Sequence, residues 1–134
     1  MFKNLIFLFL IFLSANESIG QETSSQDPFF INLFISANKT IYVENEKTDF
    51  EEVETTVADI IRNKPFKLDQ NIVYRIFADE NLKLGYIMDV NQEMLSGYSD
   101  NVQTLKYLLN TVELNIDGQN WFESIDVQKI NKSK

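Results

Sequence analysis

The alternation of apolar and polar residues along the chain predicts a small sheet. Residues 31–35 and 40–43 show the two-residue period of strands, and Asn38 between them is a natural turn residue. A third strand is predicted at 72–78, which is almost continuously apolar or β-favouring, as expected of a strand covered on both faces. A fourth strand is predicted at 102–109.

A first amphipathic helix is predicted after the hydrophilic break at 44–47. Asp49 can cap this helix while Glu52 reaches back to it in a capping box. We expect the helix to end near Lys64, because Pro65 disfavours helical geometry in the residue before it and cannot donate the next hydrogen bond. Its acidic residues fall in the first turns, where the helix dipole favours negative charge.

A second helix is predicted from about Gly85 to residue 95, and we expect Gly97 to end it in the left-handed conformation. Its apolar residues fit packing against a sheet better than binding of a partner. The order strand, strand, helix, strand, helix, strand indicates an α+β fold, with two helices packed on a small mixed sheet.

The residues after the fourth strand predict a C-terminal hairpin and a basic tail over 111–134. Residues 112–116 alternate, and Asp117 with Gly118 is a strong signal for a two-residue turn. The returning strand would carry Trp121, Phe122, Ile125 and Val127. Trp121 and Phe122 are the candidates for an exposed contact, because aromatic anchors are enriched at interfaces.

The first 20 residues have the layout of a secretory signal peptide. Lys3 precedes an apolar run at 5–13, and small residues at alternate positions end at Gly20. The run is shorter than the roughly 20 apolar residues of a spanning helix, although a short membrane anchor is the alternative. Residues 21–28 are polar and predict a flexible lead. We therefore expect an exported protein.

Composition excludes several classes of function. The 134 residues suit one domain, and the formal net charge of −8 gives no electrostatic reason to bind nucleic acid or anionic lipid. The sequence contains neither histidine nor cysteine, which rules out an imidazole base, a thiolate nucleophile, an ordinary zinc site and disulfides. We expect no cofactor, no metal and no catalytic residue.

The order of elements and several short motifs resemble the periplasmic domain of the ExbD/TolR family, over about 30–109. The resemblance rests on the alternation at 31–35, the turn and strand at 38–43, and the helix at 50–61. Above all it rests on a strand that ends in Ala78-Asp79, followed by Gly85 and a helix. In the family a tyrosine usually precedes that glycine, and here the residue is Leu84.

The resemblance implies a non-enzymatic envelope protein that takes part in energy-coupled biopolymer transport. Family members typically are single-span proteins whose periplasmic domains dimerise and work with an ExbB/TolQ-like channel. The implied location is the periplasm or the outer face of the inner membrane. We expect a homodimer formed through the edges of the sheet, which presents a surface to a TonB-like protein or to peptidoglycan.

Two other functions stay open from the sequence. The apolar run lacks the intramembrane acidic residue that the family uses in proton coupling, which favours a stand-alone secreted interaction module of the same fold. A carboxylate-based hydrolase would use Asp79 and Glu80. Their spacing fits neither a calcium loop nor a defined acid/base pair, so we expect them to lie in a solvated turn.

Overall fold

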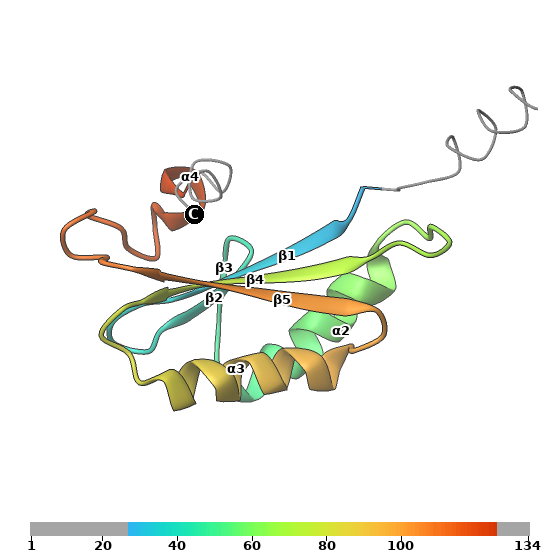
Figure 1. Cartoon of the computed structure of the whole chain (residues 1–134), viewed down its shortest axis with the longest axis horizontal. Coiled ribbons are helices and arrows are strands. Elements are labelled where there is room, and N and C mark those ends of the chain that lie inside the picture. The colour runs from blue at the N-terminus through green and yellow to red at the C-terminus, as the bar shows by residue number, and fades with distance from the viewer. Residues whose placement is uncertain (1–26, 126–134) are drawn as a thin grey trace, which may run out of the picture.

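A computed structural model describes residues 27–125, which form a mixed five-stranded sheet in the order β3-β2-β1-β4-β5 (Figure 1). The strands are β1 (Phe29–Ile35), β2 (Ile41–Val43), β3 (Glu46–Thr48), β4 (Ile72–Asp79) and β5 (Val102–Leu109). β4 pairs in parallel with both β1 and β5, whereas β2 is antiparallel to β1 and β3 is antiparallel to β2. This arrangement confirms the predicted α+β class with a small mixed sheet.

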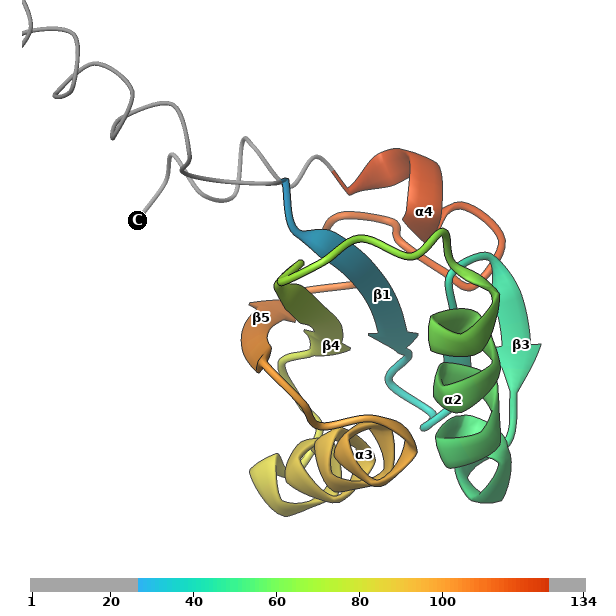
Figure 2. The ribbon, with the colours of Figure 1, turned by 90° about the vertical axis from the view of Figure 1, so that its right-hand side faces the viewer.

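Two helices cover one face of this sheet. α2 (Val53–Asn63) follows a short 3₁₀ turn, η1 (Phe50–Glu52), and lies beside α3 (Leu84–Gly97) (Figures 1 and 2). Alternate residues of the strands meet apolar residues of both helices in this layer. The helices contribute Val53, Val57, Ile87, Val90 and Met94 to its buried core. The apolar stripe of α3 is therefore core, as its spacing predicts.

A smaller core lies on the opposite face, beneath α4 (Trp121–Ser124) (Figure 1). The ring of Trp121 stacks on Phe34 with 5.4 Å between ring centroids and lies 6.3 Å from Phe77. Every residue of β4 except Arg75 is buried. The structure thus confirms that this strand is covered on both faces, and it explains the almost continuous apolar run.

The first helix begins differently from the prediction, because neither Asp49 nor Glu52 makes a side-chain capping hydrogen bond. Instead the backbone N–H of Glu52 donates to the Asp49 carbonyl at 3.0 Å, which forms the tight turn η1. The end is as predicted: α2 stops at Asn63, and Lys64 before Pro65 is extended. The preceding break at 44–47 contains a turn and most of β3, a strand that the hydrophilic sequence did not indicate.

Gly97 is the last residue of α3, which confirms the predicted end of this helix, but it does not adopt the predicted left-handed conformation. It lies directly against the backbone of α2. A Cβ atom at this position would lie 2.5 Å from the carbonyl oxygen of Glu54 and 3.2 Å from the backbone nitrogen of Ala58. Glycine is therefore needed here for helix packing rather than for chain termination.

The predicted C-terminal hairpin is wrong for the described residues, because 111–120 form turns and 121–124 form α4. The carboxylate of Asp117 accepts hydrogen bonds from the backbone N–H groups of Gln119 (2.9 Å) and Asn120 (3.0 Å). These bonds lead the chain into the helix. Val127, the predicted signal peptide, most of the polar lead and the basic tail lie outside the described residues.

Candidate interaction surface

Asp79 ends β4, and its side chain is fully buried. One carboxylate oxygen accepts the backbone N–H of Asn81 at 2.8 Å, and the other accepts the hydroxyl of Thr111 and its backbone N–H, the latter at 3.4 Å. Burial raises the pKa of this carboxyl group, but the hydrogen bonds from Thr111 and Asn81 outweigh burial and hold the pKa below its usual value.

The prediction that Asp79 and Glu80 lie in a solvated turn is therefore wrong for Asp79. Glu80 beside it is exposed, as predicted. One carboxylate is enclosed and fully engaged while the next faces solvent. They do not line a common cleft, which is what a pair of acid and base groups would need. Asp79 acts as a structural link between the end of β4 and the segment after β5.

The other two family-motif residues have ordinary environments. Ala78 is buried among the strand residues that face α2 and α3. Gly85 is exposed in the first turn of α3, and no atom beyond its chain neighbours and the local helix backbone lies within 4 Å of the position that a Cβ would occupy. Its backbone does not adopt a positive φ. Neither position shows a close approach or a conformation that explains the motif.

Trp121 and Phe122 separate in the structure. Trp121 is buried against the sheet, so the prediction of an exposed contact is wrong for this residue. Phe122 is 45% exposed and packs edge-on against Trp121, with ring centroids 5.2 Å apart. The sequence does not distinguish the two residues, because it predicts a strand where the structure has the helix α4.

A polar chain of contacts crosses the sheet on the α4 side, and the sequence did not point to it. The Arg75 Nε–H donates to the Asn32 amide oxygen at 2.7 Å, and the backbone N–H of Asn32 donates to the Glu44 carboxylate at 2.9 Å. The guanidinium carbon lies 3.8 Å from the ring centroid of Phe30. Burial lowers the pKa of Arg75. The sequence signal for these contacts was Arg75, a single charged residue inside an otherwise apolar strand until Asp79 at its end.

The two edges of the sheet differ in length and charge. The β3 edge has three residues and carries Glu46 and Lys47. The β5 edge has eight residues, of which only Lys106 is charged. Short, charged strands resist pairing with other chains, whereas a long edge with few charges invites it. Within residues 27–125 no strand covers the outer side of β5.

The hydrogen bonds at the ends of β5 show which of its backbone groups face outward. The N–H of Ile72 donates to the Asn101 carbonyl at 3.1 Å, and the N–H of Glu80 donates to the Leu109 carbonyl at 2.8 Å. Both acceptors have odd numbers, and backbone groups alternate in direction along a strand. The residues that direct their backbone groups outward are therefore Val102, Thr104, Lys106 and Leu108.

Exposed apolar side chains lie beside this edge. Thr104 donates to the side chain of Asn91 at 2.9 Å, which places the middle of α3 beside the middle of β5. The start of α3 and the end of β5 lie at the same end of the molecule (Figure 1). The exposed apolar residues toward that end are Leu84, Met88, Leu108, Val112 and Leu114. We call the β5 edge and these five side chains the β5 surface.

Other kinds of site are not found in the described part of the chain. Within residues 27–125 no group of three or more His, Cys, Asp or Glu side chains could hold a metal ion. No helix of that region has the length and apolar character needed to cross a bilayer.

Comparison with known proteins gives no family. The chain matches no protein-family model, and no curated protein is significantly similar to it in sequence. The resemblance to the ExbD/TolR family therefore rests on the motifs and on the order of elements.

Proposed function

We propose that this protein is a non-enzymatic component of energy-coupled biopolymer transport at the cell envelope, and that it acts by protein association as a homodimer. The proposal extends the resemblance to the ExbD/TolR periplasmic domain. In it, the β5 edge of one copy pairs with the β5 edge of another. The paired domains present a surface to a TonB-like protein or to peptidoglycan, in a complex with an ExbB/TolQ-like channel.

The observation that carries this proposal is the β5 surface. It combines outward-facing backbone groups with exposed apolar side chains on the strand and on the adjacent helix. Pairing would satisfy the backbone groups by adding a strand, and contact between the two copies would remove apolar side chains such as Leu108 from water. The charged, three-residue β3 edge offers neither gain.

The test is the oligomeric state of the full chain and of Lys106→Pro. Proline removes an N–H that faces away from β4, so the β4–β5 ladder keeps all its hydrogen bonds and the fold is retained. We expect the unaltered protein to be a dimer at micromolar concentration in sedimentation experiments and Lys106→Pro to be a monomer. A monomeric unaltered protein over that range contradicts the dimer.

The matched control is Lys47→Pro on the other edge strand. Tyr42 directs its backbone toward β1, and Lys47 opposite it therefore directs its N–H away from β2. The same substitution is thus made at an outward N–H of each edge. Lys47→Pro should leave the dimer intact. If this variant were instead a monomer, the dimer would form through the β3 edge, and the proposed β5 interface would be wrong.

The second candidate, a stand-alone secreted interaction module, is favoured by the absence of an acidic residue from the apolar run at 5–13. It shares the fold and the edge pairing but not the transport complex. Purification of the native protein from its own membranes separates the two functions. Co-purification of an ExbB/TolQ-like channel excludes the stand-alone module, and its consistent absence under mild extraction excludes the transport function.

A further inference from the structure

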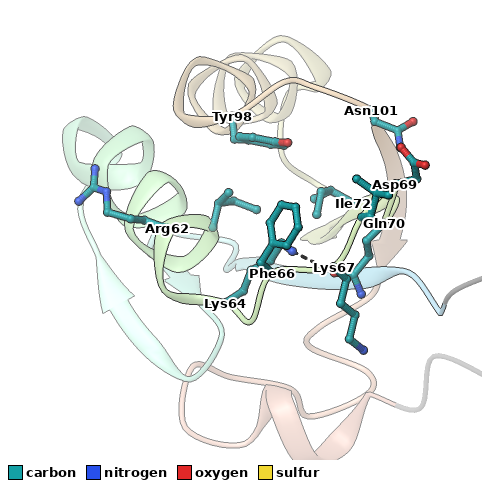
Figure 3. A pocket seen from close by; sticks show the side chains of 11 residues that line it. Arg62, Lys64, Phe66, Lys67, Asp69, Gln70, Ile72, Tyr98 and Asn101 are labelled. Carbon is teal, nitrogen blue, oxygen red and sulfur yellow. Dashed lines mark hydrogen bonds between the residues drawn. The ribbon is translucent and has the colours of Figure 1, made fainter.

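The loop between α2 and β4 exposes two large apolar side chains at its tip. Phe66 is 86% exposed and Leu68 is 67% exposed, with Lys67 between them. Both line a shallow hollow of about 430 Å³, together with Ile61, Ile72 and Tyr98 and several polar and charged side chains (Figure 3). Exposed apolar side chains rimmed by polar ones are a typical feature of a contact site.

The charge of this loop differs from that of the chain. Residues 62–70 contain three basic groups and one acidic group, whereas the whole chain has a net charge of −8. Arg62 is paired with Asp59 at 3.0 Å, and the Lys64 ammonium donates to Gln70 at 3.0 Å. Within residues 27–125 Lys67 has neither a hydrogen bond nor an ion pair. As far as these residues are concerned, its ammonium group can meet a negative group outside the protein.

The loop also lies where the described chain begins. The Gln70 side-chain amide donates to the Asp27 carbonyl at 3.0 Å, and the backbone N–H of Phe29 donates to the Asn71 carbonyl at 2.9 Å. Residues 1–26, which include the apolar run at 5–13, therefore join the domain next to this loop. An N-terminal segment that reaches a membrane would bring Phe66 and Leu68 toward the same surface.

We propose that residues 64–70 are a membrane-docking loop that inserts Phe66 and Leu68 into the interface of a phospholipid bilayer while Lys67 contacts the headgroups. Apolar side chains flanked by lysine suit this interface, because the rings and methyl groups enter the acyl boundary and the ammonium stays with the phosphates. Anionic lipid should strengthen the contact locally, although the acidic chain as a whole is not attracted to it. The proposal does not depend on pairing through β5.

The absence of cysteine from the sequence allows a direct test on the full chain. Leu68→Cys carries one environment-sensitive fluorophore at the loop, and Val112→Cys carries it at an exposed apolar residue of the β5 surface, which the Lys106→Pro background keeps uncovered. Vesicles of phosphatidylethanolamine and phosphatidylglycerol are then added. We expect the label at 68 to shift to the blue and to lose about fivefold or more of its quenching by aqueous iodide, and the label at 112 to change little.

Two further variants identify the groups responsible. In the Leu68→Cys background, Phe66→Ser should abolish most of the protection, while Phe122→Ser, at an exposed aromatic residue on α4, should not. Lys67→Glu should weaken protection more on anionic vesicles than on phosphatidylcholine. The measurements are repeated with Lys106→Pro, so that they remain interpretable if the chain forms no β5 dimer.

Three results would overturn the membrane contact. One is equal quenching of the labels at 68 and 112 with vesicles present. Another is protection that is insensitive to Phe66→Ser. The third is protection of the label at 68 without vesicles that rises with protein concentration, which would place a second copy of the chain on the loop instead.

Discussion

The side chains of Asp79 and Thr111 form a buried hydrogen bond that joins the end of β4 to the segment after β5. The backbone N–H groups of Thr111 and Asn81 donate to the same carboxylate. Removal of Asp79 leaves the buried donors of Thr111 and the part-buried N–H of Asn81 without their acceptor. We expect Asp79→Ala to lower the free energy of unfolding by about 2–3 kcal/mol in urea denaturation.

Thr111→Val separates the side-chain bond from the rest of this network. It removes the hydroxyl and leaves the backbone donors in place, so it should cost about 1–2 kcal/mol. The double variant should cost less than the sum, because both changes remove the same hydrogen bond. Strict additivity would show that the two side chains do not interact in solution.

The lowered pKa of Asp79 predicts a dependence of stability on pH. A carboxyl group whose pKa is lower in the folded than in the unfolded protein stabilises the fold above its unfolded pKa, which is about 3.9 for aspartate. That contribution is lost as the pH falls through the folded pKa. The difference in unfolding free energy between the unaltered protein and Asp79→Asn should be constant above about pH 5 and shrink below about pH 4. A constant difference down to acid unfolding would contradict the lowered pKa.

The apolar pattern predicted the strands and helices whose buried faces are visible in their own sequence. β4 is buried on both faces and reads as a continuous apolar run, and α2 and α3 have one buried face each. β3 was missed because an exposed edge strand needs few apolar residues and here consists of Glu46, Lys47 and Thr48. Nothing in its composition distinguishes it from a loop.

Tertiary contacts decided the rest of the fold and the candidate surface. The turn signal of Asp117 and Gly118 is real, but Gly118 packs against the ring of Tyr42 and the chain proceeds into α4. Asp79 could not be recognised as buried, because its partner Thr111 is 32 residues away. The β5 surface became visible only when the strand order placed β5 at an edge.

Trp121 should contribute far more to stability than its neighbour Phe122. Trp121→Ala removes the ring that stacks on Phe34 and should cost about 3–5 kcal/mol, while Phe122→Ala should cost about 1 kcal/mol or less. Within residues 27–125 the buried Trp121 Nε1–H has no acceptor, so Trp121→Phe sacrifices no hydrogen bond and should cost less than Trp121→Ala. Thermal unfolding measures the stability of all three variants. Equal effects of the two alanine variants would contradict the buried position of Trp121.

Gly97 and Gly85 should respond in opposite ways to the same substitution. Gly97→Ala places a Cβ 2.5 Å from the Glu54 carbonyl oxygen, so α3 must move away from α2, and we expect a loss of about 1–3 kcal/mol. The added Cβ of Gly85→Ala meets no atom within 4 Å beyond its chain neighbours and the local helix backbone, and the substitution should stabilise the protein by up to about 1 kcal/mol. Urea denaturation of both variants gives the comparison, and destabilisation by Gly85→Ala would reveal a constraint on that residue beyond packing.

Leu108 tests the apolar part of the β5 surface separately from its backbone. Its side chain is 57% exposed, so Leu108→Lys should leave the fold intact. In the proposed dimer this side chain becomes buried, which contributes about 1.5–3 kcal/mol to association. Its removal should therefore raise the dissociation constant by about tenfold or more. Phe122→Lys is the control, because it places the same charge at an exposed apolar residue on α4. Sedimentation equilibrium should show weaker dimerisation for Leu108→Lys alone, and an equal effect of both variants would point to general charge repulsion rather than to the β5 surface.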